Sequence, residues 1–163
     1  MRPGANSLGA AVNKRAAGRR EAAPKGTSQR KARLVVAPGH LYDRLGGMPF
    51  FDTLARRFYD RVAGDDILRP LYPEDLEQPR RHLCLFLAQF FGGPRTYEEE
   101  RGHPRLMARH LAFKIGDQER DRWLQHMTAA VKASGAGALE ESQMLTYFAA
   151  AAGSLVNSHL REG

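Results

Sequence analysis

From residue 41 onward, apolar side chains recur at intervals of three and four residues, which is the spacing of amphipathic helices. A short helix is predicted before the glycine pair at 46–47, and a longer helix is predicted from there to Gly64. The apolar stripe of this longer helix consists of Phe50, Phe51, Leu54, Phe58 and Val62. The next segment, 67–79, contains three prolines and is therefore predicted to form an irregular corner.

The second half of the chain continues the helical pattern. Residues 79–91 are strongly apolar and end at a Gly-Gly-Pro sequence, whereas residues 95–103 are polar and are predicted to form a loop. A short helix before Gly116 is followed by a longer one that Asp117 is predicted to cap, and a last helix is predicted over 139–159. No segment shows the alternation typical of a strand, so the predicted fold class is all-α.

The first 38 residues differ in composition from the rest. They are rich in Ala, Gly, Arg and Pro and contain few large hydrophobic residues, so they cannot bury enough surface to offset the entropy of ordering. Residues 1–37 contain nine Lys or Arg and one Glu, a net charge of +8, so the remainder of this +7 chain carries −1. We expect a disordered basic extension over 1–38 and one domain over 39–163.

Cysteine content and hydropathy indicate the compartment. The single cysteine, Cys84, excludes an intrachain disulfide, and no apolar run reaches the length of a transmembrane helix or a signal-peptide core. A cytoplasmic location is the expectation. The Arg-rich, acid-poor N-terminus also has the composition of an organellar transit peptide, which is the alternative.

One histidine stands out as candidate chemistry. The predicted short helix carries Leu106, Met107, His110 and Phe113 on one side, so an imidazole shares a face with three hydrophobic residues. The six histidines are scattered and form no cluster for a protein-only zinc site, which needs three or four ligands. A porphyrin supplies four nitrogens itself, so one imidazole suffices there. From the pattern alone, a core histidine with a satisfied ring nitrogen is the commoner case for a lone histidine such as His110.

The chain contains the run GGPRTYEEERGHPRL, followed by a histidine, a phenylalanine and the pentapeptide ERDRW. This combination resembles the central signature of the group II truncated haemoglobins, and the similarity extends from about residue 41 to residue 157. The resemblance implies a two-over-two helical sandwich around haem b, with His110 as the proximal ligand of the iron. The other ring nitrogen of His110 is expected to donate to a backbone carbonyl near Leu106.

The resemblance also implies further haem-site residues. Tyr97 and Arg109 are expected to bind the haem propionates, although either also fits as solvated surface. The cavity is expected to be lined by Leu83, Phe86, Phe90, Met107, Phe113, Ile115, Met127 and Phe148, each of which fits equally as plain core.

On the distal side, the resemblance selects Tyr59, Tyr72 and Trp123 as donors near the iron-bound ligand. Helical geometry alone does not choose between Phe58 and Tyr59. The distal-gate position falls on Pro79, or on Gln78 if the alignment shifts by one residue.

These residues indicate a haem globin that binds oxygen, nitric oxide and carbon monoxide, serving ligand sensing, storage or redox detoxification in preference to bulk oxygen transport. One alternative is a nitric oxide dioxygenase or peroxidase, whose reductase would be a separate protein because no flavin or nicotinamide motif is present. Another is binding of nucleic acid or a membrane surface through the basic arm; the arm has no aromatic residue, which disfavours single-strand binding. A homodimer is left open.

Overall fold

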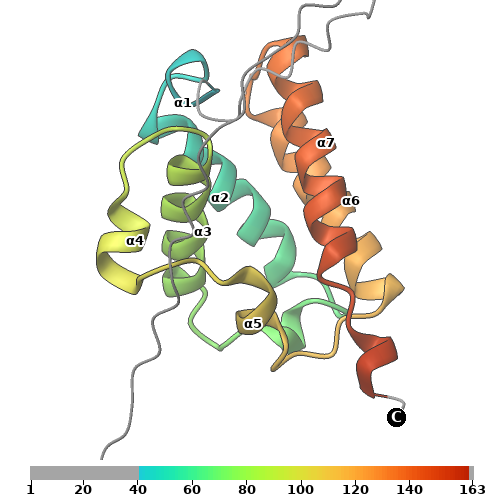
Figure 1. The fold of residues 1–163 in the computed structure, drawn as a ribbon. Helices are drawn as coiled ribbons and strands as arrows, with labels where there is room; N and C mark the ends of the chain where they lie inside the picture. The colour runs from blue at the N-terminus through green and yellow to red at the C-terminus, as the bar shows by residue number, and fades with distance from the viewer. Residues whose placement is uncertain (1–40, 162–163) are drawn as a thin grey trace, which may run out of the picture. The chain divides into compact units, whose positions relative to one another are not determined.

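The computed structural model describes residues 41–161, which form helices joined by turns and irregular segments, with no strand among them (Figure 1). This confirms the all-α class. The predicted extension over 1–38 and its boundary with the domain lie outside the described residues. The helices are α1 (Leu41–Arg44), α2 (Met48–Ala63), α3 (Glu77–Phe90), α4 (Thr96–Arg101), α5 (Leu106–His110), α6 (Asp117–Ala133) and α7 (Ala138–Ser154), with 3-10 turns η2 (Arg69–Leu71) and η3 (Ser158–Arg161). None of the described helices is long and apolar enough to cross a membrane.

Four long helices form two packed pairs. Helix α2 packs against α3, and α6 packs against α7, with α2 also contacting α6 (Figure 1). The predicted stripes face this shared core because apolar residues at helical spacing fall on one side of each helix. The largest fully buried side chains are Phe51, Phe58, Phe91, Phe148, Leu41, Leu54, Leu68, Leu87, Met127, Met144, Val62 and Val131. The arrangement is the two-over-two sandwich that the resemblance to the group II truncated haemoglobins implies.

The predicted loop over 95–103 is wrong, because α4 lies within it. Most of this helix is polar, so it has no apolar stripe to reveal it, and contacts with α3 hold it in place. The backbone N–H of Glu98 donates to the Gln89 side chain at 3.0 Å. Arg81 makes two hydrogen bonds to Glu100, at 2.6 and 2.7 Å. The one buried residue of α4, Tyr97, packs edge-on against Phe86.

Two helix ends also differ from the prediction. Gly116, and not Asp117, is the cap residue of α6, and its N–H donates to the Glu119 carboxylate at 2.8 Å. Helix α7 ends at Ser154 and does not continue to residue 159. The chain leaves the helix there because the N–H groups of Asn157 and Ser158 bond to the carbonyl of Ile115, at 2.9 and 3.1 Å.

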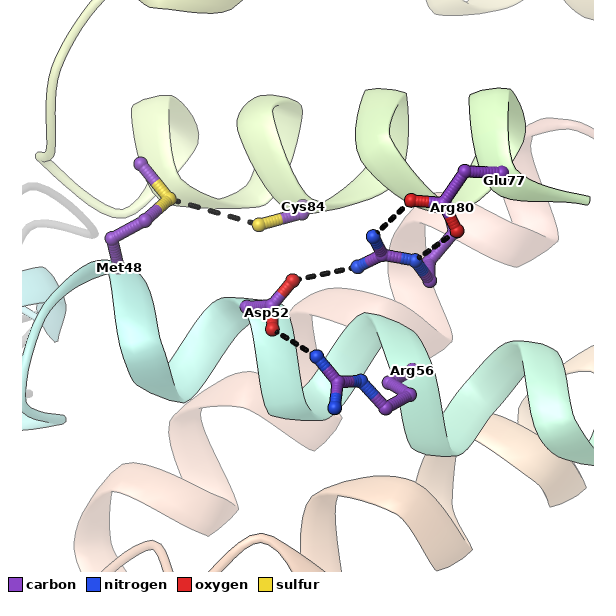
Figure 2. A network of polar contacts seen from close by, with 6 residues as sticks. All are labelled: Met48, Asp52, Arg56, Glu77, Arg80 and Cys84. Carbon is purple, nitrogen blue, oxygen red and sulfur yellow. Dashed lines mark hydrogen bonds and ion pairs between the residues drawn. The ribbon is translucent and has the colours of Figure 1, made fainter.

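An ion network joins the middle of α2 to the first turn of α3 (Figure 2). Asp52 accepts hydrogen bonds from Arg56 at 2.7 Å and from Arg80 at 2.6 Å, and Arg80 also pairs with Glu77. The Arg80 side chain is only 20% exposed, so this pair is better shielded from solvent than a typical surface ion pair. The hydrogen bond from Arg80 lowers the pKa of Asp52 below its ordinary 3.8. The network therefore fixes the start of α3.

We predict that Asp52→Asn lowers the free energy of unfolding by about 1 kcal/mol at pH 7. Because the folded-state pKa of Asp52 is depressed, its contribution is present above pH 3.8 and is lost as the pH falls through the folded value. The difference between wild type and variant, measured by urea unfolding, should therefore narrow on acidification. The exposed Asp66→Asn is the control. A pH-independent difference would contradict this account.

Candidate functional site

A cavity of about 510 Å³ lies between α2, the corner over 68–73, α3, α5, α6 and α7. Its volume falls in the range of small-molecule and cofactor sites. Most of the residues highlighted from the sequence line it: Phe58, Tyr59, Tyr72, Pro79, Leu83, Phe86, Tyr97, Arg109, His110, Phe113, Ile115, Trp123 and Phe148. The tertiary structure thus brings together side chains that are spread over 91 positions, from Phe58 to Phe148.

His110 is the last residue of α5, and its ring is fixed by one short hydrogen bond. Nδ1 lies 2.6 Å from the carbonyl oxygen of Leu106, which is the partner that the sequence predicts. A carbonyl can only accept, so Nδ1 carries the proton and donates it. In the neutral ring Nε2 then keeps its lone pair, and this is the form in which imidazole binds a metal.

The short helix that carries His110 is held by polar contacts. None of its five residues is buried, and it follows Arg105, whose φ of 43° is in the left-handed region. Pro104 lies before this residue and therefore outside the helix. The guanidinium of Arg109 donates to the carbonyls of Pro104 at 2.9 Å and Arg101 at 3.0 Å. Arg109 thus braces the start of α5 while it also borders the cavity.

Two tyrosines and a tryptophan share hydrogen bonds on the cavity wall. The hydroxyls of Tyr59 and Tyr72 are hydrogen-bonded to each other, and the indole N–H of Trp123, which can only donate, bonds to the hydroxyl of Tyr72. Burial raises the pKa of Tyr72 to about 12, although both of these hydrogen bonds oppose the shift. Burial, the nearby Tyr72 and the hydrogen bond to it raise the pKa of Tyr59 well above its ordinary 10.0. Both phenols are therefore protonated at neutral pH, and Phe58 lies beside them on the wall.

A buried acid–base pair anchors the corner that carries Tyr72 to the helix that carries Trp123. Asp65 accepts from the N–H groups of Ile67 and Leu68 and from Nε2 of His126, the last at 2.6 Å. Arg61 donates to Nδ1 of His126 at 3.2 Å. Burial alone would raise the pKa of Asp65, but these hydrogen bonds outweigh burial and lower it. The ionised carboxylate therefore holds the start of the corner against α6.

Three of the expected cavity residues lie elsewhere. Phe90 stacks on Tyr147 with ring centroids 4.0 Å apart, Met107 is 50% exposed on α5, and Met127 is fully buried in the core. None of these residues lines the cavity. Helical spacing identifies an apolar face but does not say which part of that face borders a cavity and which part packs against a neighbouring helix.

Sequence reasoning missed a polar end of the cavity. His82 and Arg101 line it, and Nη1 of Arg101 lies 3.0 Å from Nε2 of His82. A guanidinium can only donate, so Nε2 accepts, and burial together with Arg101 lowers the pKa of His82. The guanidinium of Arg101 also lies 5.9 Å from the ring centroid of Tyr97. With Arg109, two arginines therefore border this end. Only the position of Arg101 within the GGPRTYEEERGHPRL run could have indicated it.

The cavity suits a particular kind of group. Its lining is largely apolar, it offers one imidazole with an available Nε2, and three arginines, Arg101, Arg109 and Arg120, border it. A large flat hydrophobic group that contains a metal able to take one imidazole ligand and that carries carboxylates at its edge would fit this combination.

Comparisons with known proteins agree with this geometry. The family model described as bacterial-like globin matches residues 40–157. The chain is 44% identical over 85 residues to the group 2 truncated hemoglobin YjbI of Bacillus subtilis, which covers 52% of this chain and 64% of that protein. The chain thus spans slightly less than two thirds of that relative's length.

Two solved structures are similar over most of the described residues. A thermostable hemoglobin from the actinobacterium Thermobifida fusca is 51% identical with a TM-score of 0.71, covering 72% of this chain and 97% of that chain. A hemoglobin from Chloroflexus aurantiacus is 48% identical, also with a TM-score of 0.71, covering 72% and 98%.

We predict that Tyr59 and Tyr72 stay protonated well above pH 10. Both pKa values are raised over the ordinary 10.0, so the stability that they contribute is present below pH 10 and is lost as the pH rises further. NMR of protein labelled with ¹³C at tyrosine Cζ should show both resonances unmoved at pH 10.5. As the pH rises above 10, the melting temperature of Tyr59→Phe should fall less than that of wild type. Ionisation of either phenol near pH 10 in the folded protein would contradict the buried network.

Proposed function

Because this chain belongs to the bacterial-like globin family and, within it, to the group II truncated haemoglobins, we propose that it binds haem b in the cavity of about 510 Å³. Its proposed function is to bind oxygen and other small diatomic ligands at a single iron. His110 is the proposed iron ligand.

The hydrogen bond at His110 is the observation that best supports this proposal. Donation from Nδ1 to the Leu106 carbonyl makes Nε2 the ring nitrogen with a lone pair, and it restrains rotation of the ring. Such an outer-shell partner also makes the coordinating nitrogen more basic. Arg101, Arg109 and Tyr97 at the cavity edge are the proposed partners of the haem carboxylates.

When bound, haem supplies an iron that takes oxygen, nitric oxide or carbon monoxide as a ligand. The protein's part is to donate hydrogen bonds to that ligand. The indole N–H of Trp123 donates to the oxygen of Tyr72, and in this proposal the hydroxyl of Tyr59 does the same, so the proton of Tyr72 itself is available to the ligand. A donor held in an apolar cavity stabilises partial negative charge more strongly than it would in water.

Pro79 contributes differently. It borders the cavity at the proposed distal gate, whereas Gln78 does not. Proline has no N–H and its side chain has no donor, so it offers bulk and no hydrogen bond. Ligand stabilisation therefore falls to the Tyr72 network.

A ligand held by Tyr72 leaves slowly, which favours sensing, storage or redox detoxification over bulk oxygen transport. The same donor network supports a second candidate, oxidation of nitric oxide to nitrate with oxygen as the oxidant. A separate reductase would return the iron to its ferrous state after each turnover.

We predict that His110→Ala abolishes the proximal-histidine spectrum and speeds haem loss by more than about 100-fold. Loss of an outer-shell partner alone weakens metal binding by up to about 100-fold, and loss of the ligand itself should cost more. Absorption spectra of the ferric, ferrous and carbonmonoxy forms, followed by haem transfer to an acceptor globin, provide the measurement. The exposed His159→Ala is the control and should behave as wild type. A wild-type spectrum in His110→Ala would assign the iron to another ligand.

We also predict that Tyr72→Phe raises the oxygen dissociation rate constant about tenfold, which corresponds to one hydrogen bond of about 1.4 kcal/mol. Tyr59→Phe should have a smaller effect, because it removes only a bond that orients Tyr72. Tyr147→Phe is the matched control, since Tyr147 is another cavity tyrosine with a pKa raised by burial. Stopped-flow oxygen release measures all three. An equal increase in the Tyr147 variant would show a general loosening of the cavity and not a ligand hydrogen bond.

A further inference from the structure

Helix α5 poses a mechanical problem. It carries the proposed iron ligand, yet none of its residues is buried, so packing does not fix it. The side chain of Arg109, the residue before His110, reaches back to the carbonyls of Pro104 and Arg101, which lie ahead of the helix. That contact ties α5 to the segment that precedes it, so the connection to the segment that follows it must be held by something else.

Asn157 supplies that second restraint from beyond the end of α7. Its Nδ2 group donates to the carbonyl of His110 at 3.1 Å and to the carbonyl of Phe113 at 2.9 Å. Its Oδ1 accepts from the N–H of Ile115 at 2.9 Å, and its backbone N–H donates to the carbonyl of Ile115. One side chain therefore binds His110, the last residue of α5, and two residues of the segment that follows it.

The arrangement is rigid for two reasons. Asn157 is 2% exposed, so water does not compete for its hydrogen bonds. Its Nδ2 partners are both carbonyls and its Oδ1 partner is an N–H, so reversing the amide would break all three bonds. The partners lie 42 to 47 positions earlier in the chain, so the contact links the end of α7 directly to the end of α5.

We propose that Asn157 is a positioning residue for the iron ligand. This rests on the proposed role of His110. The Leu106 carbonyl fixes the imidazole ring and Asn157 fixes the backbone of the same residue, so together they set where Nε2 lies. Leu155, two residues before Asn157, lines the cavity, so one short segment both forms part of the wall and holds the ligand's backbone.

The test compares Asn157→Asp and Asn157→Ser with a core control. The Asp variant keeps the size and the acceptor for Ile115 but replaces the donor with an oxygen that faces two carbonyls. The Ser variant replaces the amide with a small hydroxyl that introduces no charge. It provides the same test if the Asp variant does not fold. Val62→Ala is the control, because Val62 is fully buried on α2 and its truncation lowers stability without touching α5.

Resonance Raman of the ferrous protein measures the iron–histidine stretching band, and hydrogen exchange measures opening of residues 110–116. We expect both Asn157 variants to shift or broaden the band, to accelerate exchange in 110–116, and to speed haem loss about tenfold, as for an outer-shell partner. Val62→Ala should lower the melting temperature and leave the band in place.

Asn157 variants that lower the melting temperature like Val62→Ala but leave the band and the 110–116 exchange unchanged would overturn the proposal, since Asn157 would then be merely structural. Failure of the proposed function looks different. In that case wild type would lack the iron–histidine band, or the band would survive in His110→Ala, and the positioning role would be overturned with it.

Discussion

The hydrogen bond from Nδ1 of His110 to the Leu106 carbonyl is the interaction on which the proposed site depends. It lies within a single turn of helix, spans 2.6 Å and leaves Nε2 as the only ring nitrogen that can bind a metal. Because α5 has no buried face, polar contacts must hold what apolar packing usually holds. Arg109 and Asn157 do so from its two ends, each by donating to backbone carbonyls.

Polar contacts also shape the cavity wall, which must be apolar and yet able to donate a hydrogen bond to a ligand. Buried hydroxyl and indole groups must find partners, and here Tyr59 and Trp123 are both hydrogen-bonded to Tyr72. With Tyr72 as the proposed acceptor of both hydrogen bonds, its own proton is available to a ligand. The Asp65–His126 pair holds Tyr72 and Trp123 near each other, because it fixes the corner that carries Tyr72 against the helix that carries Trp123.

Around the cavity, the residues that stabilise the helices differ from the residues that line the proposed binding site. Asp52, Arg80 and Glu77 fix the first turn of α3 from outside, so Pro79 and Leu83 can line the cavity without themselves holding the helix (Figure 2). At the polar end, Arg101 and His82 hold each other through a hydrogen bond. These groups are thus positioned before any cofactor binds, which reduces the cost of ordering them on binding.

The sequence by itself determined the helical class, the long helices and their buried stripes, because side-chain periodicity is local and decides which face of a helix turns inward. Its resemblance to the group II truncated haemoglobins, carried by the GGPRTYEEERGHPRL run, is confirmed by the family match. Local pattern failed at α4, which has no apolar stripe, and could not separate Met127 in the core from Phe86 on the cavity wall.

Only the tertiary structure decided which groups hydrogen-bond to which. The hydrogen bonds of Tyr72 to Tyr59 and Trp123, the pairing of His82 with Arg101 and the contacts of Asn157 all join residues that are distant in the chain. The sequence names the donors and acceptors but not their partners. That choice depends on which groups the packed helices bring within about 3 Å of one another, and hydrogen bonds weaken steeply beyond that distance.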